Sequence, residues 1–382
     1  MGRAENMNIK KGSYADKILT AICFSGDFPY KSLYLLDDNL QMLQRNARRL
    51  RDYGYISILG SGQTRTLRML QKGIDFMMTL RPELTEYFLF VSENNTARGG
   101  KTGETALVRR HRLAESMVII QRAGIYFLKE QKPFMDIDAL NTGVVKTPLI
   151  DKSYYYNSRE LKNVKPSAKY KYAFTRFLGA IFSPANAYLV YNTNKGLIKW
   201  NNQGENKAKM LVDNLYNVFF DVKGYKEVDS AIIFAKDMEV LLKILNSKRG
   251  KKDKQGFQYL SFDNTFPNTH FITLDKQGIN QMFMLTEKGF EDIILNALFK
   301  HNNNTYSGGD YYDKATNTLK IEFFSGNIGK LKRFNNLKDL RSNLNYEVLC
   351  FDFQEQVLRD YLDKKIKITA IPEAKFYDLY YY

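Results

Sequence analysis

The stretch from residue 39 to residue 69 constrains the fold of this chain more than any other segment. Its first half has apolar residues at the spacing of one helical face, and this predicted helix is capped by Asp38 or Asn39 and stopped by Gly54. The apolar positions are Leu40, Leu43, Ala47 and Leu50. Its second half has two strand-like runs joined by a Gly60-Ser61-Gly62 turn. The sequence therefore predicts a helix followed directly by a two-stranded hairpin.

Two shorter helical patterns precede this segment. Residues 14–24 carry apolar side chains on one face, Gly26 and Pro29 interrupt the pattern, and residues 30–36 suit a second short helix. Three helices followed by a hairpin is the element order of the winged-helix fold. We therefore expect residues 1–82 to form a winged-helix domain.

The third helix and the hairpin carry most of the charge of this domain. Between residues 40 and 80 there are seven Lys or Arg and two acids. Long donor side chains on such a helix can reach base edges and phosphates in a major groove, and a basic wing can contact phosphates beside it. The candidate contacts are Gln41, Gln44, Arg45, Arg48 and Arg49 on the helix, and Arg65 and Arg68 on the hairpin. We expect double-stranded DNA binding, with a solvated charged face and a protein-binding winged helix as the alternatives.

The charge of the whole chain agrees with a polyanionic partner. Lys and Arg number 57 against 41 acids, and the formal net charge of +16 attracts nucleic acid, an anionic membrane or an acidic protein. No apolar run is long enough to span a membrane, and the first residues lack the apolar core of a signal peptide. Cys23 and Cys350 both lie in apolar runs, so neither a disulfide framework nor a zinc cluster is expected. We expect a cytoplasmic protein without membrane contact.

A basic helix follows within a helical extension that covers residues 83–150. The pattern of residues 104–123 predicts a long amphipathic helix. Its candidate DNA contacts are Arg109, Arg110 and Arg112. Such a helix can extend the DNA footprint, build a homodimer, or support the winged helix from within the same chain. His111 has no neighbouring histidine or cysteine, so we expect no metal site there.

Residues 151–185 form a basic connector rich in tyrosine. Tyr154, Tyr155 and Tyr156 precede a series of lysines that stand among further aromatic residues. Rings that stack on bases, beside lysines that follow phosphates, suit a single-stranded nucleic acid. A tyrosine-rich edge of a sheet has the same composition, so the sequence leaves both interpretations open.

Beyond residue 186 the pattern changes to alternating strands and helices. Strand-like runs begin near Ala187, Ala231, His270 and Glu347, and helical patterns separate them. We therefore expect residues 186–382 to form an α/β domain with a mixed, partly parallel sheet, for which a restriction-nuclease-like fold is one option. The chain as a whole is expected to be of the α+β class.

The second half contains few arrangements that suggest catalysis. The chain has no phosphate-binding glycine loop, no paired-histidine metal motif and no nucleophilic serine elbow. A restriction-type nuclease needs an acid followed two residues later by a lysine, and a second acid upstream. Glu205 and Lys207 have the first spacing, but the nearest upstream acid, Glu160, lies in a different segment. We expect no catalysis, no cofactor and no bound metal, and a magnesium-dependent nuclease using Glu205 and Lys207 is the alternative.

Five short motifs of the first half lie at residues 45–50, 54–56, 70–74, 109–115 and 123–124. Together they resemble the replication-relaxation family of plasmids and integrative conjugative elements. The resemblance implies a DNA-binding protein that supports replication and DNA relaxation of such an element. It also implies a carboxy-terminal α/β domain reminiscent of restriction-type nucleases, but this chain lacks their complete catalytic set.

The sequence thus predicts a non-enzymatic, sequence-specific DNA-binding protein of a plasmid or another mobile element. Its expected role is to support replication, DNA relaxation or transfer, or to regulate transcription. Replication or transfer proteins, and a second copy of the chain, are the further partners that this role implies. A protein-interaction scaffold remains an alternative beside the nuclease.

Overall fold

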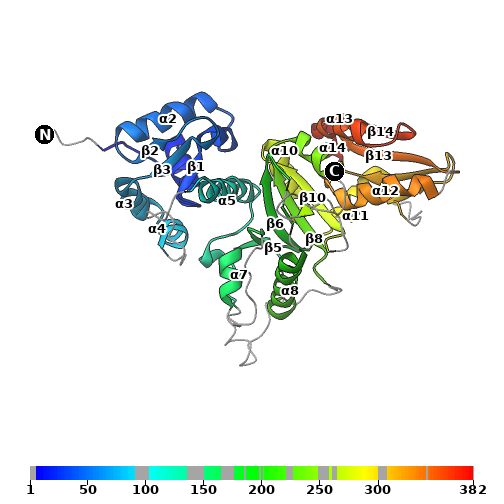
Figure 1. Cartoon of the computed structure of the whole chain (residues 1–382), viewed down its shortest axis with the longest axis horizontal. Coiled ribbons are helices and arrows are strands. Elements are labelled where there is room, and N and C mark those ends of the chain that lie inside the picture. Colours follow the sequence, from blue (N-terminus) through cyan, green and yellow to red (C-terminus); the bar gives the residue numbers. More distant parts are fainter. Residues whose placement is uncertain are drawn as a thin grey trace. The chain divides into compact units, whose positions relative to one another are not determined.

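A computed structural model of the chain divides into two compact units (Figure 1). Unit 1 comprises Met1–Phe134 with Leu274–Ile279, and unit 2 comprises Met135–Thr273 with Asn280–Tyr382. The structure describes residues 6–90, 103–135, 150–164, 176–184, 186–197, 199–200, 202–220, 227–247, 258–259, 265–299, 308–340 and 343–381. Within these ranges no helix has the length and apolar character that a membrane crossing requires.

Unit 1 begins with three helices, as the sequence predicts. They are α1 (Tyr14–Cys23), the 3-10 helix η1 (Tyr30–Leu35) and α2 (Leu40–Asp52). Asn39 caps α2, because its side-chain oxygen accepts the backbone N–H of Met42 at 3.1 Å. Leu43, Ala47 and Leu50 are fully buried, which fixes the inward side of α2.

A three-stranded antiparallel sheet completes the winged helix. Its strands are β1 (Asp27–Pro29), β2 (Ile56–Leu59) and β3 (Thr66–Met69), in the order β1-β3-β2. The 3-10 turn η2 (Gly62–Thr64) lies at the tip of the β2–β3 hairpin, which is the wing. The winged helix and the α+β class of the chain are therefore confirmed, and the short strand β1 is an addition that the sequence did not reveal.

Further helices follow the hairpin in unit 1. They are α3 (Gln71–Leu80), α4 (Pro82–Thr85), the π-helix η3 (Glu86–Phe90), α5 (Glu104–Arg122) and the short 3-10 helix η4 (Lys129–Gln131). The α5 helix packs against β1. Ser32 in η1 donates a hydrogen bond of 2.6 Å to Glu115 of α5, and Arg122 donates one to the carbonyl of Leu35. Helix α5 thus supports the winged helix from within unit 1, which extends past residue 82 to Phe134.

One buried carboxylate joins β1, β3 and α5. Asp27 of β1 is 1% exposed, and its two oxygens accept the Nε–H groups of Arg68 at 2.8 Å and of Arg110 at 2.6 Å. Arg68 lies in β3 and Arg110 in α5. A buried charge is tolerated only when it is paired and hydrogen-bonded, so these three side chains hold the three elements together.

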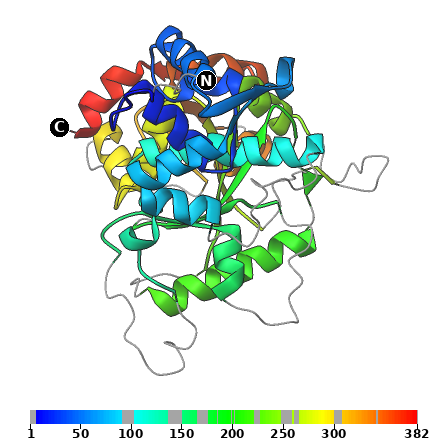
Figure 2. The same cartoon turned by 90° about the vertical axis from the view of Figure 1, so that its left-hand side faces the viewer.

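The first sheet of unit 2 is five-stranded, in the order β10-β8-β6-β5-β4. Its elements are β4 (Tyr154–Asn157), α7 (Ser158–Val164), β5 (Gly179–Phe182), β6 (Ala187–Asn194), α8 (Asn202–Phe219), β8 (Ser230–Ala235), α9 (Met238–Leu245) and β10 (Asn268–Thr273). Strands β6, β8 and β10 are parallel, and β4, β5 and β6 are antiparallel. The small strands β7 (Lys199–Trp200) and β9 (Gln258–Tyr259) pair apart from this sheet. Helix α8 is the long green helix in both views (Figures 1 and 2).

The second sheet is four-stranded, in the order β11-β12-β13-β14. Its elements are β11 (Tyr311–Asp313), β12 (Thr318–Glu322), α12 (Ile328–Leu340), β13 (Asn345–Phe351), α13 (Asp352–Tyr361), β14 (Ile366–Ile371) and α14 (Glu373–Tyr381). Along the chain, α10 (Lys276–Thr286) and α11 (Phe290–Phe299) stand between the two sheets. Strands β12, β13 and β14 are parallel, and β11 is antiparallel to β12.

The two sheets of unit 2 follow the same chain path. In each, a hairpin (β5–β6 or β11–β12) leads to a helix, a parallel strand, a helix and a second parallel strand. The helices at equivalent places in the two paths, α9 and α13, pack against each other. A mixed, partly parallel sheet is therefore present twice, and the first begins with β4 and β5, before the expected boundary at residue 186.

The tyrosines of the connector lie in the first sheet. Tyr154, Tyr155 and Tyr156 are buried in β4, which is an edge strand. Buried rings cannot stack on bases, so this part of the connector agrees with the sheet-edge interpretation. Lys165, Lys169 and Lys171 lie outside the described residues.

Replacing Asp27 with Asn should destabilise unit 1 by about 3–5 kcal/mol, because Arg110 would remain buried without its carboxylate. Urea unfolding of the full chain measures the change in the free energy of unfolding. Hydrogen exchange in peptides from β1 and α5 shows whether that change lies in unit 1. The matched control is Asp52→Asn, which removes an exposed carboxylate paired with Arg51 and should cost less than about 1 kcal/mol. Equal effects of the two substitutions would contradict the role of Asp27.

Candidate nucleic-acid interface

The polar side chains of α2 share one side of the helix. Gln41, Gln44, Arg45 and Arg48 follow the i, i+3, i+4, i+7 spacing of a helical face, and Arg49 lies four residues after Arg45. Gln44 is half-buried and the other four are exposed. We call these five residues the α2 face. Leu43, Ala47 and Leu50 are buried in unit 1, so the α2 face points away from its core, whereas Leu40, expected on the buried side, is 38% exposed at the first position of the helix.

The three arginines of the α2 face have no acidic partner. Among the residues that the structure describes, Arg45, Arg48 and Arg49 form no ion pair and no side-chain hydrogen bond. Arg51, on the same helix, differs because it pairs with Asp52 at 2.7 Å. The 13 residues of α2 span about 20 Å, a length that can lie along a major groove about 12 Å wide.

The wing adds one exposed and positioned arginine. Arg65 lies just before β3, and its guanidinium carbon is 4.0 Å from the centre of the Tyr30 ring. A cation stacked on an aromatic ring keeps its charge and restricts its rotamers. Gly60 allows the tight turn that precedes it, with φ at +71°, and a Cβ there would lie 3.0 Å from the carbonyl oxygen of Thr64.

Two of the expected DNA contacts are structural residues instead. Arg110 is only 7% exposed, and it forms the ion pair with Asp27 inside unit 1. Arg68 is half-buried, and its guanidinium forms two hydrogen bonds with the same carboxylate. Both are therefore removed from the candidate interface, because moving either to a phosphate would leave Asp27 without that partner.

Arg109, Arg112 and His111 of α5 differ in exposure. Arg109 is exposed and remains a candidate contact, whereas Arg112 is half-buried. His111 is buried, and its Nε2 lies 3.0 Å from the hydroxyl of Thr66. Burial lowers the pKa of His111 to about 4, so the ring is neutral at physiological pH and contributes no positive charge.

The alternative catalytic pair is not brought together. Glu205 lies on α8, fully buried, and accepts the backbone N–H of Arg176 at 2.8 Å and the hydroxyl of Tyr191 at 2.9 Å. Lys207 is exposed on another side of the same helix, because residues two apart do not face each other. In the described ranges no group of three or more His, Cys, Asp or Glu could hold a metal ion. Glu205 is therefore a buried structural acid.

Sequence reasoning missed Asp27, which holds Arg68 and Arg110 in the interior, and Tyr30, which positions Arg65. Asp27 lies in a strand of three residues, which is too short to show a period, and Tyr30 lies in a helical pattern without a distinguishing feature. The one available signal was an acid placed between a glycine and an aromatic residue at the end of a helix, which many loops share.

The candidate interface is identified from the structure of this chain alone. Comparison of the chain with family models, with curated proteins and with solved structures gave no match. Any assignment of function to this chain rests on the α2 face, on Arg65 of the wing and on the charge around them.

Replacing Glu205 with Gln should stabilise unit 2 at neutral pH. Burial raises the pKa of Glu205 in the folded protein, although its hydrogen bonds oppose this. As the pH rises from 4.5, the ordinary pKa of a glutamate, to the higher pKa of the folded state, ionisation of Glu205 lowers the free energy of unfolding. Gln stays neutral, so the Tm advantage of the variant should grow between these pKa values and then stay constant. Thermal unfolding followed by fluorescence of the single tryptophan, Trp200, measures it across pH.

The exposed Glu239 offers a matched control, and Glu239→Gln should show no such dependence on pH. A wild-type protein that gains stability over the Glu205→Gln variant as the pH rises would show that Glu205 is favoured as an anion.

Proposed function

We propose that the chain is a sequence-specific double-stranded DNA-binding protein whose α2 face enters the major groove. The observation that carries this proposal is the α2 face itself. It holds three exposed arginines without an acidic partner among the described residues, on a helix that buries Leu43, Ala47 and Leu50 on its other side. An exposed and uncompensated set of guanidinium groups is suited to phosphates and to base edges.

Readout of the sequence is assigned to the first half of α2. Gln41, Gln44 and Arg45 lie nearest its amino-terminal end, which is the part of a recognition helix that reaches base edges. Glutamine can form two hydrogen bonds with adenine, and arginine two with guanine. Arg48 and Arg49 lie one turn further along and suit phosphates.

The wing and α5 extend the phosphate contacts. Arg65 is exposed and held by Tyr30, and Arg109 is exposed on α5. Contacts of this kind carry no sequence information, but they fix the register of the protein on the duplex. The net charge of +16 adds attraction to DNA over a longer range.

The cellular role that we propose follows the resemblance to the replication-relaxation family. Binding to plasmid or other mobile-element DNA would support replication, DNA relaxation or transfer, or would regulate transcription. The family-like motifs at residues 45–50 and 54–56 lie on α2 and at the entry to β2, beside the α2 face. Unit 2 would then recruit replication or transfer proteins, and the proposal includes no catalytic step.

Replacing Arg45, Arg48 and Arg49 together with Ala should weaken binding to a mixed-sequence duplex by roughly 100-fold or more, since each such contact supplies about 1–3 kcal/mol. The slope of the logarithm of affinity against the logarithm of salt concentration should also decrease by up to about 2, because Arg48 and Arg49 are assigned to phosphates and each phosphate contact contributes about 0.9. Fluorescence anisotropy titrations of the full chain at several salt concentrations measure both quantities.

The matched control removes three exposed positive charges from unit 2, by replacing Arg359, Lys364 and Lys365 with Ala. This control should keep nearly all of the affinity, although it changes the net charge equally. An equal loss of affinity in both variants would show that the arginines of the α2 face act only through the net charge. Unchanged affinity of the α2 variant would show that these arginines are not part of the interface.

A further inference from the structure

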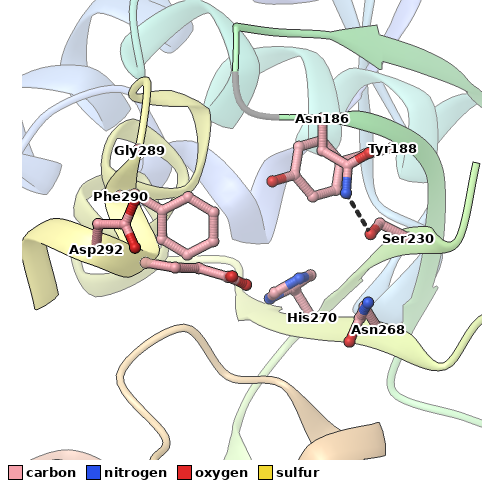
Figure 3. A pocket seen from close by; sticks show the side chains of 9 residues that line it. Asn186, Tyr188, Ser230, Asn268, His270, Gly289, Phe290 and Asp292 are labelled. Atoms are coloured by element: carbon pink, nitrogen blue, oxygen red, sulfur yellow. Dashed lines mark hydrogen bonds between the residues drawn. The ribbon is translucent and has the colours of Figure 1, made fainter. Parts of the chain in front are cut away.

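The amino ends of three parallel strands in unit 2 form the floor of a cavity. The strand register aligns Tyr188 of β6, Ser230 of β8 and Asn268 of β10 in one row. Asn186 and His270 lie two residues from this row, so their side chains are on the same side of the sheet. The cavity has a volume of about 170 Å³, and Gly289–Asp292 at the start of α11 form its other wall (Figure 3).

The polar floor is held in place by Asp229. Its carboxylate accepts hydrogen bonds from Ser230 Oγ at 2.6 Å, Asn268 Nδ2 at 2.8 Å and Asn186 Nδ2 at 3.3 Å. The Asn186 amide also donates to Ser230 at 2.8 Å (Figure 3). Asn327 fixes the amide oxygen of Asn268 at 3.1 Å. These groups satisfy one another, so the floor is preformed and does not depend on a ligand.

His270 is the exception, because it has a ring nitrogen without a partner. The residue is 2% exposed, and its Nδ1 donates to the carbonyl of Ser325 at 2.9 Å. Its Nε2 then carries the lone pair, and it accepts no hydrogen bond from any residue that the structure describes. Burial lowers the pKa of His270 to about 4, so the ring is neutral. Nε2 opens onto the cavity that His270 lines, so it is an acceptor available to a donor group of a ligand.

Carboxylates outnumber cations around the cavity. Glu291 and Asp292 line the cavity, and the described charges that act on Glu291 are the carboxylates of Glu322, Asp310 and Asp229 and the cation of Lys330. The Nζ of Lys330 is already occupied, at 2.6 Å from Glu322 and 3.1 Å from Asp310. Although Glu291 is exposed at the start of α11, partial desolvation raises its pKa, Lys330 opposes this, and the carboxylates of Glu322, Asp310 and Asp229 add to the rise. A cation in the cavity would relieve this repulsion.

Aromatic rings line the same space. The His270 ring lies edge-on between Tyr188 and Phe290, with ring centres 5.7 Å and 6.4 Å away. In Figure 3 the His270 ring extends from β10 toward the side that Phe290 closes. Aromatic faces attract cations, most strongly when water is excluded.

We propose that this cavity binds a compact organic cation with N–H donors, namely a guanidinium group. One N–H donates to His270 Nε2, the carboxylates of Glu291 and Asp292 accept others, and the planar group lies against Phe290. Such a group is the end of an arginine side chain or a free small molecule, and both present the same chemistry. The inference concerns unit 2 alone, so it stands or falls independently of the α2 face.

The test titrates the full chain with methylguanidinium and follows the histidine ring nitrogens by NMR. Saturable binding should shift the Nε2 resonance of His270 and leave that of His111 unchanged. Tetramethylammonium, which has the charge but no N–H donor, should bind at least about tenfold more weakly, since a hydrogen bond to a charged group is lost. The peptide Gly-Arg-Gly, compared with free methylguanidinium, distinguishes a side chain from a small molecule as the source.

Two variants keep the proposal falsifiable if His270 cannot be replaced without unfolding. Glu291→Gln, at the exposed start of α11, should weaken methylguanidinium binding roughly tenfold, and the control Glu239→Gln should not. No saturable shift at His270, equal binding of tetramethylammonium, or unchanged affinity in Glu291→Gln would each overturn the proposal. A preference for methylammonium over methylguanidinium would overturn the assignment to guanidinium.

Discussion

The buried carboxylate of Asp27 is the interaction on which unit 1 depends. It holds β1, β3 and α5 together by accepting hydrogen bonds from Arg68 and Arg110. By using these two arginines in its interior, the unit separates structural arginines from those that remain exposed. The α2 face and Arg65 belong to the exposed set, and these residues form the proposed interface. A count of charged residues cannot separate structural arginines from exposed ones.

Local patterns were enough to predict the winged helix. The periodic apolar residues of α2, its asparagine cap and the glycine turn of the wing all act over a few neighbours in the chain. The pairing of Arg68 and Arg110 could not be predicted, because their common partner lies 41 and 83 residues away. An arginine in an amphipathic helix has the same local pattern whether it faces solvent or a buried acid.

In unit 2, too, local sequence patterns could not reveal contacts between residues that are distant in the sequence. The predicted strands near β6, β8, β10 and β13 are present, but β12 and α12 were not predicted, and they supply Glu322 and Lys330. Glu205 and Lys207 match the spacing of an acid followed two residues later by a lysine, but on helix α8 the two side chains lie on different sides. His270 looked isolated in sequence, since its neighbours in the cavity come from strands that are adjacent only in the folded sheet.

Hydrogen exchange of the full chain, with and without a duplex selected from a random-sequence pool, tests the central claim most directly. The proposal requires slower exchange in peptides that cover α2 and the β2–β3 wing, because bound DNA covers them. Peptides from β1, which Asp27 already fixes in the interior, should change little. Failure to select any duplex, or protection confined to unit 2 while α2 exchanges as before, would contradict the account.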